Sequence, residues 1–124
     1  MNNAMQICYG ELMYRYINIK KDMPSVDYAV YLLDCEILDS VALNNHVIVV
    51  VHGYGSSGEK SKIKSSVHSY CTHLKKMGKI RGFVAGECWS SDDEICKNIL
   101  RFAPDVEIKE NLLAHNSGIS IILV

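Results

Sequence analysis

The chain has 124 residues, of which 48% are hydrophobic and 22% charged, and its formal net charge is −1. This length fits a single domain with one core, residues 1–124, and the balanced charge excludes a disordered or a uniformly basic protein. The five cysteines are irregularly spaced without a C-x-x-C pair, so we expect no metal or cofactor and a cytoplasmic protein. The N-terminal stretch lacks signal-peptide features, which also favours the cytoplasm. No apolar run approaches the roughly 20 residues that span a bilayer, so we expect no membrane partner.

The first third of the chain predicts a strand followed by a helix. Residues 14–19 alternate in hydropathy and are rich in β-formers, which is typical of a strand. Pro24 and Ser25 then mark a helix start, with Ser25 as the N-cap, and Asn44 and Asn45 suit the helix end. Apolar residues recur between them at helical spacing: Val26, Ala29, Val30, Leu33, Ile37 and Val41.

The remaining elements alternate in type along the chain. Residues 46–51 form a continuous β-branched run, the pattern of a central strand buried on both faces. A glycine-rich loop leads to an amphipathic helix over residues 61–77, and residues 79–85 predict a third strand. A short helix is expected within residues 89–104, and the strongly apolar residues 118–124 predict a final strand deep in the sheet.

The order of these elements is β-α-β-α-β, then a helical excursion that we interpret as an insertion over about 88–114, then β. Because β-α-β connections are nearly always right-handed, the parallel pairs have little topological freedom. The two long helices each have one apolar face. We therefore predict a two-layer α/β sandwich with a four-stranded mixed sheet and two main helices.

The loop HGYGSSGEKS after the second strand has several interpretations. Gly53 and Gly58 have P-loop spacing, but Glu59 stands where that motif needs its lysine. An α/β-hydrolase would need a G-x-S-x-G nucleophile motif, which the chain lacks. A plain strand-to-helix turn that uses glycine for positive φ is a third interpretation, and it assigns no function to the loop.

A fourth interpretation takes the charge around the loop into account. A glycine loop entering a helix leaves backbone N–H groups that bind anions. Residues 60–81 hold seven basic residues and no acidic one. His52, at the mouth of the loop, can donate to a phosphate or shuttle a proton during phosphodiester cleavage. This interpretation predicts a site for a nucleic-acid backbone, since phosphate contacts position a protein without reading sequence.

With this loop the chain resembles the Smr (small MutS-related) domain family over residues 17–124. The closing GISIILV is similar to the last strand of that family, and residues 17–33 are loosely similar to its L-D-x-H-G-x-T-x-x-E-A segment. The family's H-G-x-G-x-G loop is matched by His52, Gly53, Tyr54, Gly55, Ser56, Ser57 and Gly58. The third glycine of that motif, Gly58 in this chain, comes one residue later than in the family.

The resemblance implies a fold similar to the C-terminal domain of bacterial translation initiation factor three. It also implies binding to DNA or RNA, and endonuclease activity in several members. That activity depends on the L-D-x-H segment, in which this chain has Asn18 in place of the acid and Lys20 in place of the histidine. Asn18 cannot serve as a general base, and Lys20 at its ordinary pKa transfers no proton near neutrality, so we expect binding more than cleavage.

The predicted site therefore has His52 as its one catalytic candidate. Tyr54 is the expected stacking residue, whereas Trp89 is expected to pack under the inserted helix. The alternative on the same fold is an inactive protein-interaction or small-ligand module. The residues predicted to hold the phosphates are Gly53, Tyr54, Gly55, Ser56, Ser57, Gly58, Lys60, Lys62, Lys64 and Lys20.

Overall fold

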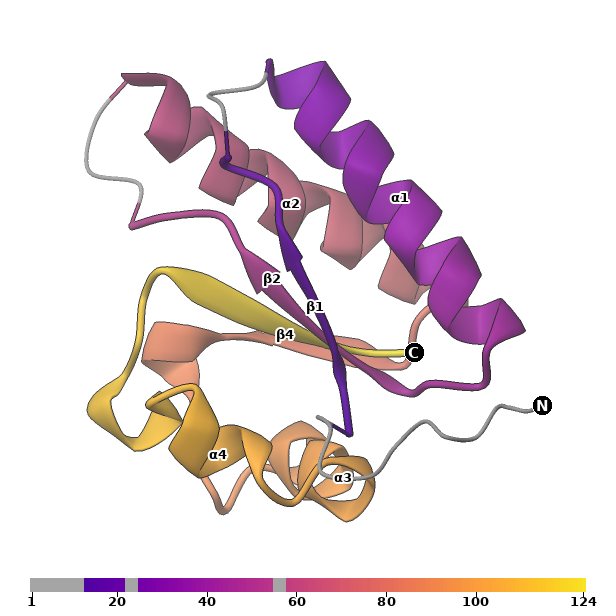
Figure 1. The fold of residues 1–124 in the computed structure, drawn as a ribbon, viewed down its shortest axis with the longest axis vertical. Coiled ribbons are helices and arrows are strands. Elements are labelled where there is room, and N and C mark those ends of the chain that lie inside the picture. Colours follow the sequence, from indigo (N-terminus) through magenta and orange to yellow (C-terminus); the bar gives the residue numbers. More distant parts are fainter. Residues whose placement is uncertain (1–12, 22–24, 55–57) are drawn as a thin grey trace, which may run out of the picture.

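Four strands form one mixed sheet in the computed structural model, which describes residues 13–21, 25–54 and 58–124, without the side chains of 58–61. The strand order is β1-β2-β4-β3 (Figure 1). β1 is parallel to β2, and β4 runs antiparallel to both β2 and β3. The strands are β1 (Arg15–Asn18), β2 (Val47–Val51), β3 (Gly82–Ala85) and β4 (Ile119–Leu123). The predicted mixed sheet of four strands is confirmed.

Helices cover both faces of this sheet. α1 (Val26–Ala42) and α2 (Gly58–Lys76) lie on one face, while α3 (Glu94–Phe102) and α4 (Val106–Lys109) lie on the other (Figure 1). Two short 3₁₀ turns, η2 (Gly86–Cys88) and η3 (Leu112–Ala114), flank the second pair.

The predicted two-layer sandwich is therefore wrong in one respect, because the molecule has three layers. The segment 88–114, which we interpreted as an insertion, supplies the third layer. The physical reason is that β2 and β4 carry apolar side chains on both faces, and each face must be covered.

The central strands show this directly. Successive side chains of a strand point to opposite faces. Val47 and Val49 belong to the core under α3 and α4, whereas Ile48 and Val50 belong to the core under α1 and α2. Every residue of β4 is buried, which confirms the predicted deep position of the last strand.

Local signals placed the helix starts well. Ser25 caps α1, as predicted, by accepting a hydrogen bond from the Tyr28 N–H at 3.2 Å. Asp93 caps α3 by accepting from the N–H groups of Ile95 and Cys96 at 3.0 and 3.3 Å. Such caps pair backbone donors that would otherwise lack a partner, and each contributes about 1 kcal/mol. α2 begins at Gly58, three residues before the predicted start at Ser61.

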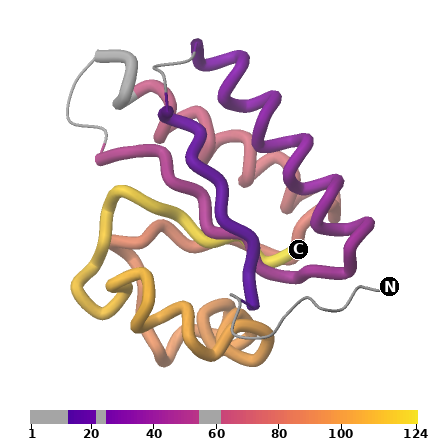
Figure 2. The backbone as a smooth tube through the Cα atoms, viewed as in Figure 1, coloured from indigo at the N-terminus to yellow at the C-terminus, as the bar shows by residue number. Residues whose placement is uncertain are grey.

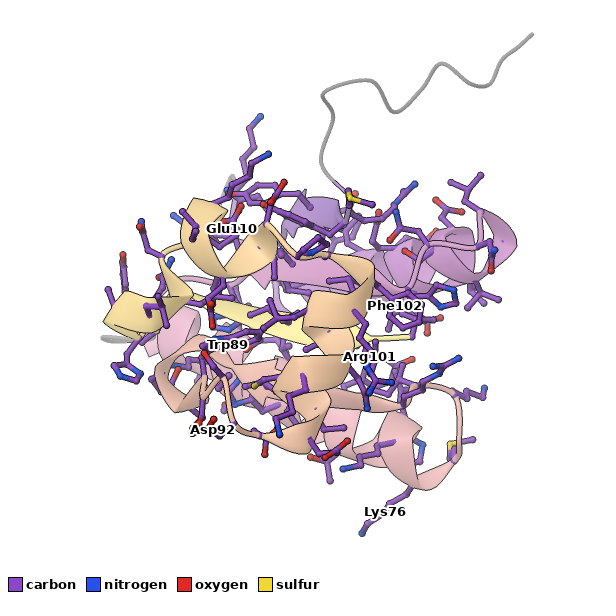
Figure 3. All side chains as sticks on the ribbon, turned by 90° about the horizontal axis from the view of Figure 1, so that it is seen from below. Lys76, Trp89, Asp92, Arg101, Phe102 and Glu110 are labelled. Atoms are coloured by element: carbon purple, nitrogen blue, oxygen red, sulfur yellow. The ribbon has the colours of Figure 1, made fainter. Side chains whose placement is uncertain are left out.

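The third layer is anchored on Trp89, which is buried beneath α3 and α4 (Figure 3). Its indole Nε1–H donates to Glu107 Oε2 at 2.8 Å, and Ser91 Oγ donates to the same oxygen at 2.5 Å. Both hydrogen bonds lower the pKa of Glu107, and the one from Ser91 has the larger effect. The expectation that Trp89 packs under the inserted helix is confirmed.

Gly86 fixes the approach of the segment before β4. A Cβ added at this position would lie 1.8 Å from the carbonyl oxygen of Asn116 and 3.0 Å from that of Ile119. Only glycine allows these backbones to meet. This contact holds the start of β4 next to the end of β3, beside the glycine loop.

The described part of the chain contains no helix that is both long and apolar enough to cross a membrane.

Candidate functional site

His52, Gly53 and Tyr54, the described start of the glycine loop, follow the end of β2 that is opposite the chain's C-terminus (Figure 2). Gly53 has a φ of +86°, a conformation that favours glycine. The N–H groups of His52 and Gly53 both donate to the carbonyl oxygen of Gly118, at 3.1 and 3.0 Å. The start of the loop is thus held to the turn that precedes β4.

Beneath the loop, two histidines and a serine form a chain of hydrogen bonds. His52 Nδ1 lies 2.8 Å from the carbonyl oxygen of Gly53, and its Nε2 lies 2.8 Å from Ser120 Oγ. Ser120 Oγ also lies 2.9 Å from His68 Nε2. The two imidazole rings meet edge to face, with centroids 5.6 Å apart.

The hydrogen-bond partners in this network determine the tautomers of the two histidines. The carbonyl of Gly53 only accepts, so His52 Nδ1 carries a hydrogen and donates to it. In a neutral imidazole Nε2 is then an acceptor, and Ser120 donates to it. Ser120 Oγ in turn accepts from His68 Nε2–H. This assignment satisfies every member of the chain with both rings neutral.

Burial keeps both histidines neutral near pH 7. It lowers the pKa of His52 from its ordinary 6.5 to about 4, although the hydrogen bond to Gly53 acts in the opposite direction. Burial also lowers the pKa of His68, and the positive charge of Lys64 lowers it further. A charged imidazole here would lose water, and the attraction of Glu87 is opposed by the repulsion from Lys64.

The enclosure of His52 changes its predicted role. Its side chain is 0% exposed and both ring nitrogens are hydrogen-bonded, so a phosphate outside the loop cannot reach it in this conformation. His52 acts on the loop from below by fixing the carbonyl of Gly53. It is a positioning residue in this geometry, not one that touches a ligand.

Sequence reasoning missed Ser120 and His68 as members of this network. The available signal was a single polar residue, Ser120, within the otherwise apolar GISIILV. A polar side chain at a buried strand position needs a partner, which His52 and His68 provide. The position of His68 on α2 beside the buried Val67 and Cys71 agrees with this role.

Lys64 is turned toward the interior side of the site. Its Nζ donates to Glu87 Oε2 at 2.8 Å and to the carbonyl oxygen of Ser117 at 3.0 Å, and its side chain is only 16% exposed. Partial burial raises the pKa of Glu87, but the hydrogen bond from Lys64 outweighs this effect and the net pKa is lowered. The predicted phosphate contact of Lys64 would have to compete with this ion pair.

The outer side of the loop is built differently. Tyr54 is 70% exposed, and its ring lies over Gly118, where an added Cβ would approach the ring atoms to 3.3 Å. Lys20, which is exposed, runs past Gly53, and its Cδ lies 3.1 Å from where a Gly53 Cβ would be.

Two surface cavities meet at Tyr54. One of about 230 Å³ is lined by Tyr16, Lys20, Val51, Gly53, Tyr54, Glu110, Asn116, Gly118 and Ile119. The other, of about 300 Å³, is lined by Tyr54, Asn111, Ala114, His115, Asn116 and Ser117. An exposed aromatic ring that borders two hollows can accept a planar ring. One of these hollows is lined by both Lys20 and Glu110, so it carries groups of opposite charge.

The remaining predicted residues are placed only in part. Gly55, Ser56 and Ser57 lie outside the described residues, as does the side chain of Lys60. Gly58 is the first residue of α2, and Lys62 is exposed in the helix's first turns. The structure thus brings Lys20 and Tyr54 together on one surface. Gly53 lies buried beneath them, and its N–H is already paired with the Gly118 carbonyl, so it offers no free donor to a phosphate.

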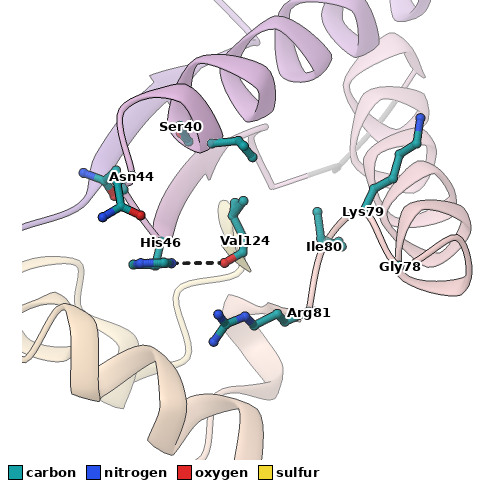
Figure 4. Close-up of a pocket in the computed structure, with 10 residues that line it drawn as sticks. Ser40, Asn44, His46, Gly78, Lys79, Ile80, Arg81 and Val124 are labelled. Atoms are coloured by element: carbon teal, nitrogen blue, oxygen red, sulfur yellow. Dashed lines mark hydrogen bonds between the residues drawn. The ribbon is translucent and has the colours of Figure 1, made fainter.

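A further cavity, of about 250 Å³, lies at the opposite end of the central strands (Figure 4). Its lining includes Ser40, His46, Arg81 and Val124, and His46 Nδ1 lies 3.4 Å from the carbonyl oxygen of Val124. It shares no residue with the glycine loop.

Comparison of the chain with models of protein families, with curated proteins and with solved structures finds no match.

Proposed function

We propose that this chain is a nucleic-acid-binding domain of the Smr type, which holds a backbone phosphate at the outer face of the glycine loop. The observation that carries the proposal is the exposed Tyr54 beside Lys20 at the start of the loop, where both line one surface cavity. Helix N-termini attract anions through unpaired N–H groups, and α2 follows this loop along the chain. In the proposal the start of α2 and the ammonium group of Lys20 attract the same phosphodiester backbone.

The proposal is for binding, not for cleavage by His52. General acid–base catalysis requires the group to come within hydrogen-bonding reach of the proton that it moves. The imidazole of His52 is enclosed and neutral, and its two nitrogens are hydrogen-bonded to Gly53 and Ser120. Its function in the proposal is to hold the loop in the shape that binds the ligand.

The exposed Tyr54 favours a nucleic acid with unpaired bases as the ligand. A base that stacks on an aromatic ring contributes about 1–3 kcal/mol of binding free energy, and it must first leave any duplex. Tyr54 lines two surface cavities, and these leave room for a base beside its ring. Single strands, or single-stranded regions of folded RNA, are therefore the proposed ligands.

A salt titration with labelled single-stranded DNA and RNA tests the proposal. Displacement of counterions from phosphates makes the logarithm of affinity fall linearly with the logarithm of salt concentration. We expect such a slope for the natural chain, and Lys62→Glu should weaken binding several-fold because it reverses a charge in the first turns of α2.

Lys97→Glu is the matched control, because Lys97 is exposed on α3, on the other side of the sheet. It makes the same charge change away from the site and should leave the affinity nearly unchanged. Equal losses from both variants would indicate attraction to net charge only. Absence of binding at low salt would remove the proposal.

A further inference from the structure

The outward face of α1 is apolar, although no other described element covers it. Tyr28, Tyr31 and Leu38 are 53%, 60% and 64% exposed. The face that points to the sheet is also apolar, with Ala29, Leu33 and Ile37 buried. α1 thus has apolar residues on two opposite sides.

The exposed residues have the spacing of a helix-pairing seam. At 100° per residue, Tyr28, Tyr31, Cys35, Leu38 and Ala42 lie on one stripe, separated by alternating steps of three and four residues. This is the spacing with which one helix packs along another. An apolar stripe along a helix is normally buried against another element.

The charges on α1 indicate what covers the stripe. All four of its charged residues are acidic: Asp27, Asp34, Glu36 and Asp39. Asp34 accepts a hydrogen bond from the Tyr70 hydroxyl at 2.6 Å, and Glu36 pairs with Arg15, so these two are matched within the fold. Asp27 and Asp39 flank the stripe on its two sides, and among the described residues neither forms a salt bridge, although Asp39 attracts the Arg15 guanidinium at longer range.

We propose that the outer face of α1 docks a basic amphipathic helix of a partner protein. The apolar residues of that helix pack on Tyr31 and Leu38, and its lysines or arginines flank the seam and pair with Asp27 and Asp39. A second copy of the chain fits poorly, because pairing α1 with itself brings acidic helices together. An anionic membrane surface is disfavoured by the same charge, since it attracts basic helices.

The probe is a fluorescent two-heptad peptide with leucine at the seam positions and lysine at the flanking positions. Anisotropy titrations against the purified chain should give saturable binding that weakens with salt. The double variant Tyr31→Ser and Leu38→Ser should lose at least tenfold in affinity. Asp27→Asn combined with Asp39→Asn should lose about three- to tenfold and flatten the salt dependence.

Two controls keep the test specific. The same peptide with glutamate in place of lysine should not bind. The double variant Ile108→Ser and Leu113→Ser removes comparably exposed apolar side chains from the third layer and should bind like the natural chain. Since all substituted side chains are exposed, circular dichroism should show every variant folded.

Other results would overturn the inference. These are no binding of the lysine peptide, equal binding by the seam variant, a concentration-dependent dimer that the seam substitutions abolish, or preferential binding to phosphatidylserine vesicles. None of these outcomes bears on nucleic-acid affinity at the glycine loop, so the two proposals stand or fall separately.

Discussion

The inner and outer sides of the glycine loop differ in whether their polar groups already have partners within the fold. On the inner side His52, Ser120 and His68 are linked by hydrogen bonds and are neutral. On the outer side Tyr54 and Lys20 are exposed and border surface cavities. The inner groups have satisfied one another, whereas the outer groups can still gain interactions from a ligand.

The difference teaches that burial, not residue type, assigns the work within this motif. A histidine next to a glycine loop has the chemistry of a catalyst, but an enclosed and neutral histidine contributes to folding. Substitutions on the inner side should therefore change stability first, and substitutions on the outer side should change affinity alone.

Gly86→Ala should have the largest effect. Its Cβ would meet the Asn116 carbonyl at 1.8 Å, so backbone must move, and we expect a loss of about 3 kcal/mol or more in the free energy of unfolding. Urea unfolding measures this loss. Gly78→Ala is the control, because Gly78 has a φ of +74° but nothing within 4 Å of the added Cβ. Strain alone should cost it about 1 kcal/mol, and equal losses would contradict the steric argument.

His52→Ala should have the next largest effect, a loss of about 2–4 kcal/mol in the free energy of unfolding, because it leaves a cavity and removes a partner of Ser120.

The natural chain should also lose stability in acid. The folded-state pKa of His52 is about 4 against 6.5 when unfolded, so below pH 6.5 the unfolded state takes up a proton that the folded state does not. The loss should develop between pH 6.5 and 4 and amount to about 3 kcal/mol, at 1.36 kcal/mol per pKa unit.

Urea unfolding of the natural chain and of His52→Gln at several pH values tests the second part. The glutamine variant lacks this titrating group, so its stability should depend less on pH in that window. The lowered pKa of His68 acts in the same direction and should leave a smaller residual dependence. Identical pH profiles for both proteins would show that His52 is not held neutral by burial.

Tyr54→Ala should leave stability unchanged and lower affinity for single-stranded nucleic acid about tenfold, from the loss of a stacked base. Tyr54→Phe keeps the ring and should bind nearly as well as the natural chain. Quenching of 2-aminopurine placed in the oligonucleotide reports the stacking directly. If Tyr54→Ala left the salt-dependent affinity unchanged, the result would agree with the phosphate site and contradict the stacking role of Tyr54.

Lys64→Met should have the smallest effect. It removes the ion pair with the partly exposed Glu87 and should cost about 0.5–1 kcal/mol in stability. Its salt slope for nucleic-acid binding should match that of the natural chain, because Lys64 is already paired on the inner side. A reduced slope, measured by the same salt titration, would show that Lys64 leaves Glu87 to contact a phosphate.

Much of the fold was predictable from local signals. The Ser25 cap, the β-branched run of β2 and the apolar last strand each indicate their element through a few neighbouring residues. A helix was expected within residues 89–104, where α3 lies, but its place in a third layer was missed because the segment 88–114 was interpreted as an insertion. The need for this layer shows only in the second apolar face of β2 and β4, which is a property of the assembled sheet.

The sequence by itself determined which elements form and in what order, because hydrophobic periodicity and capping act over a few neighbouring residues. It also placed Gly53 and Tyr54 in a loop between β2 and α2. Only the tertiary structure decided that His52 points inward to Ser120, that Lys64 is held by Glu87, and that Lys20 lies beside Gly53. These contacts join residues far apart in the chain, and they depend on which strands become neighbours in the sheet and which side chains lose water when they do.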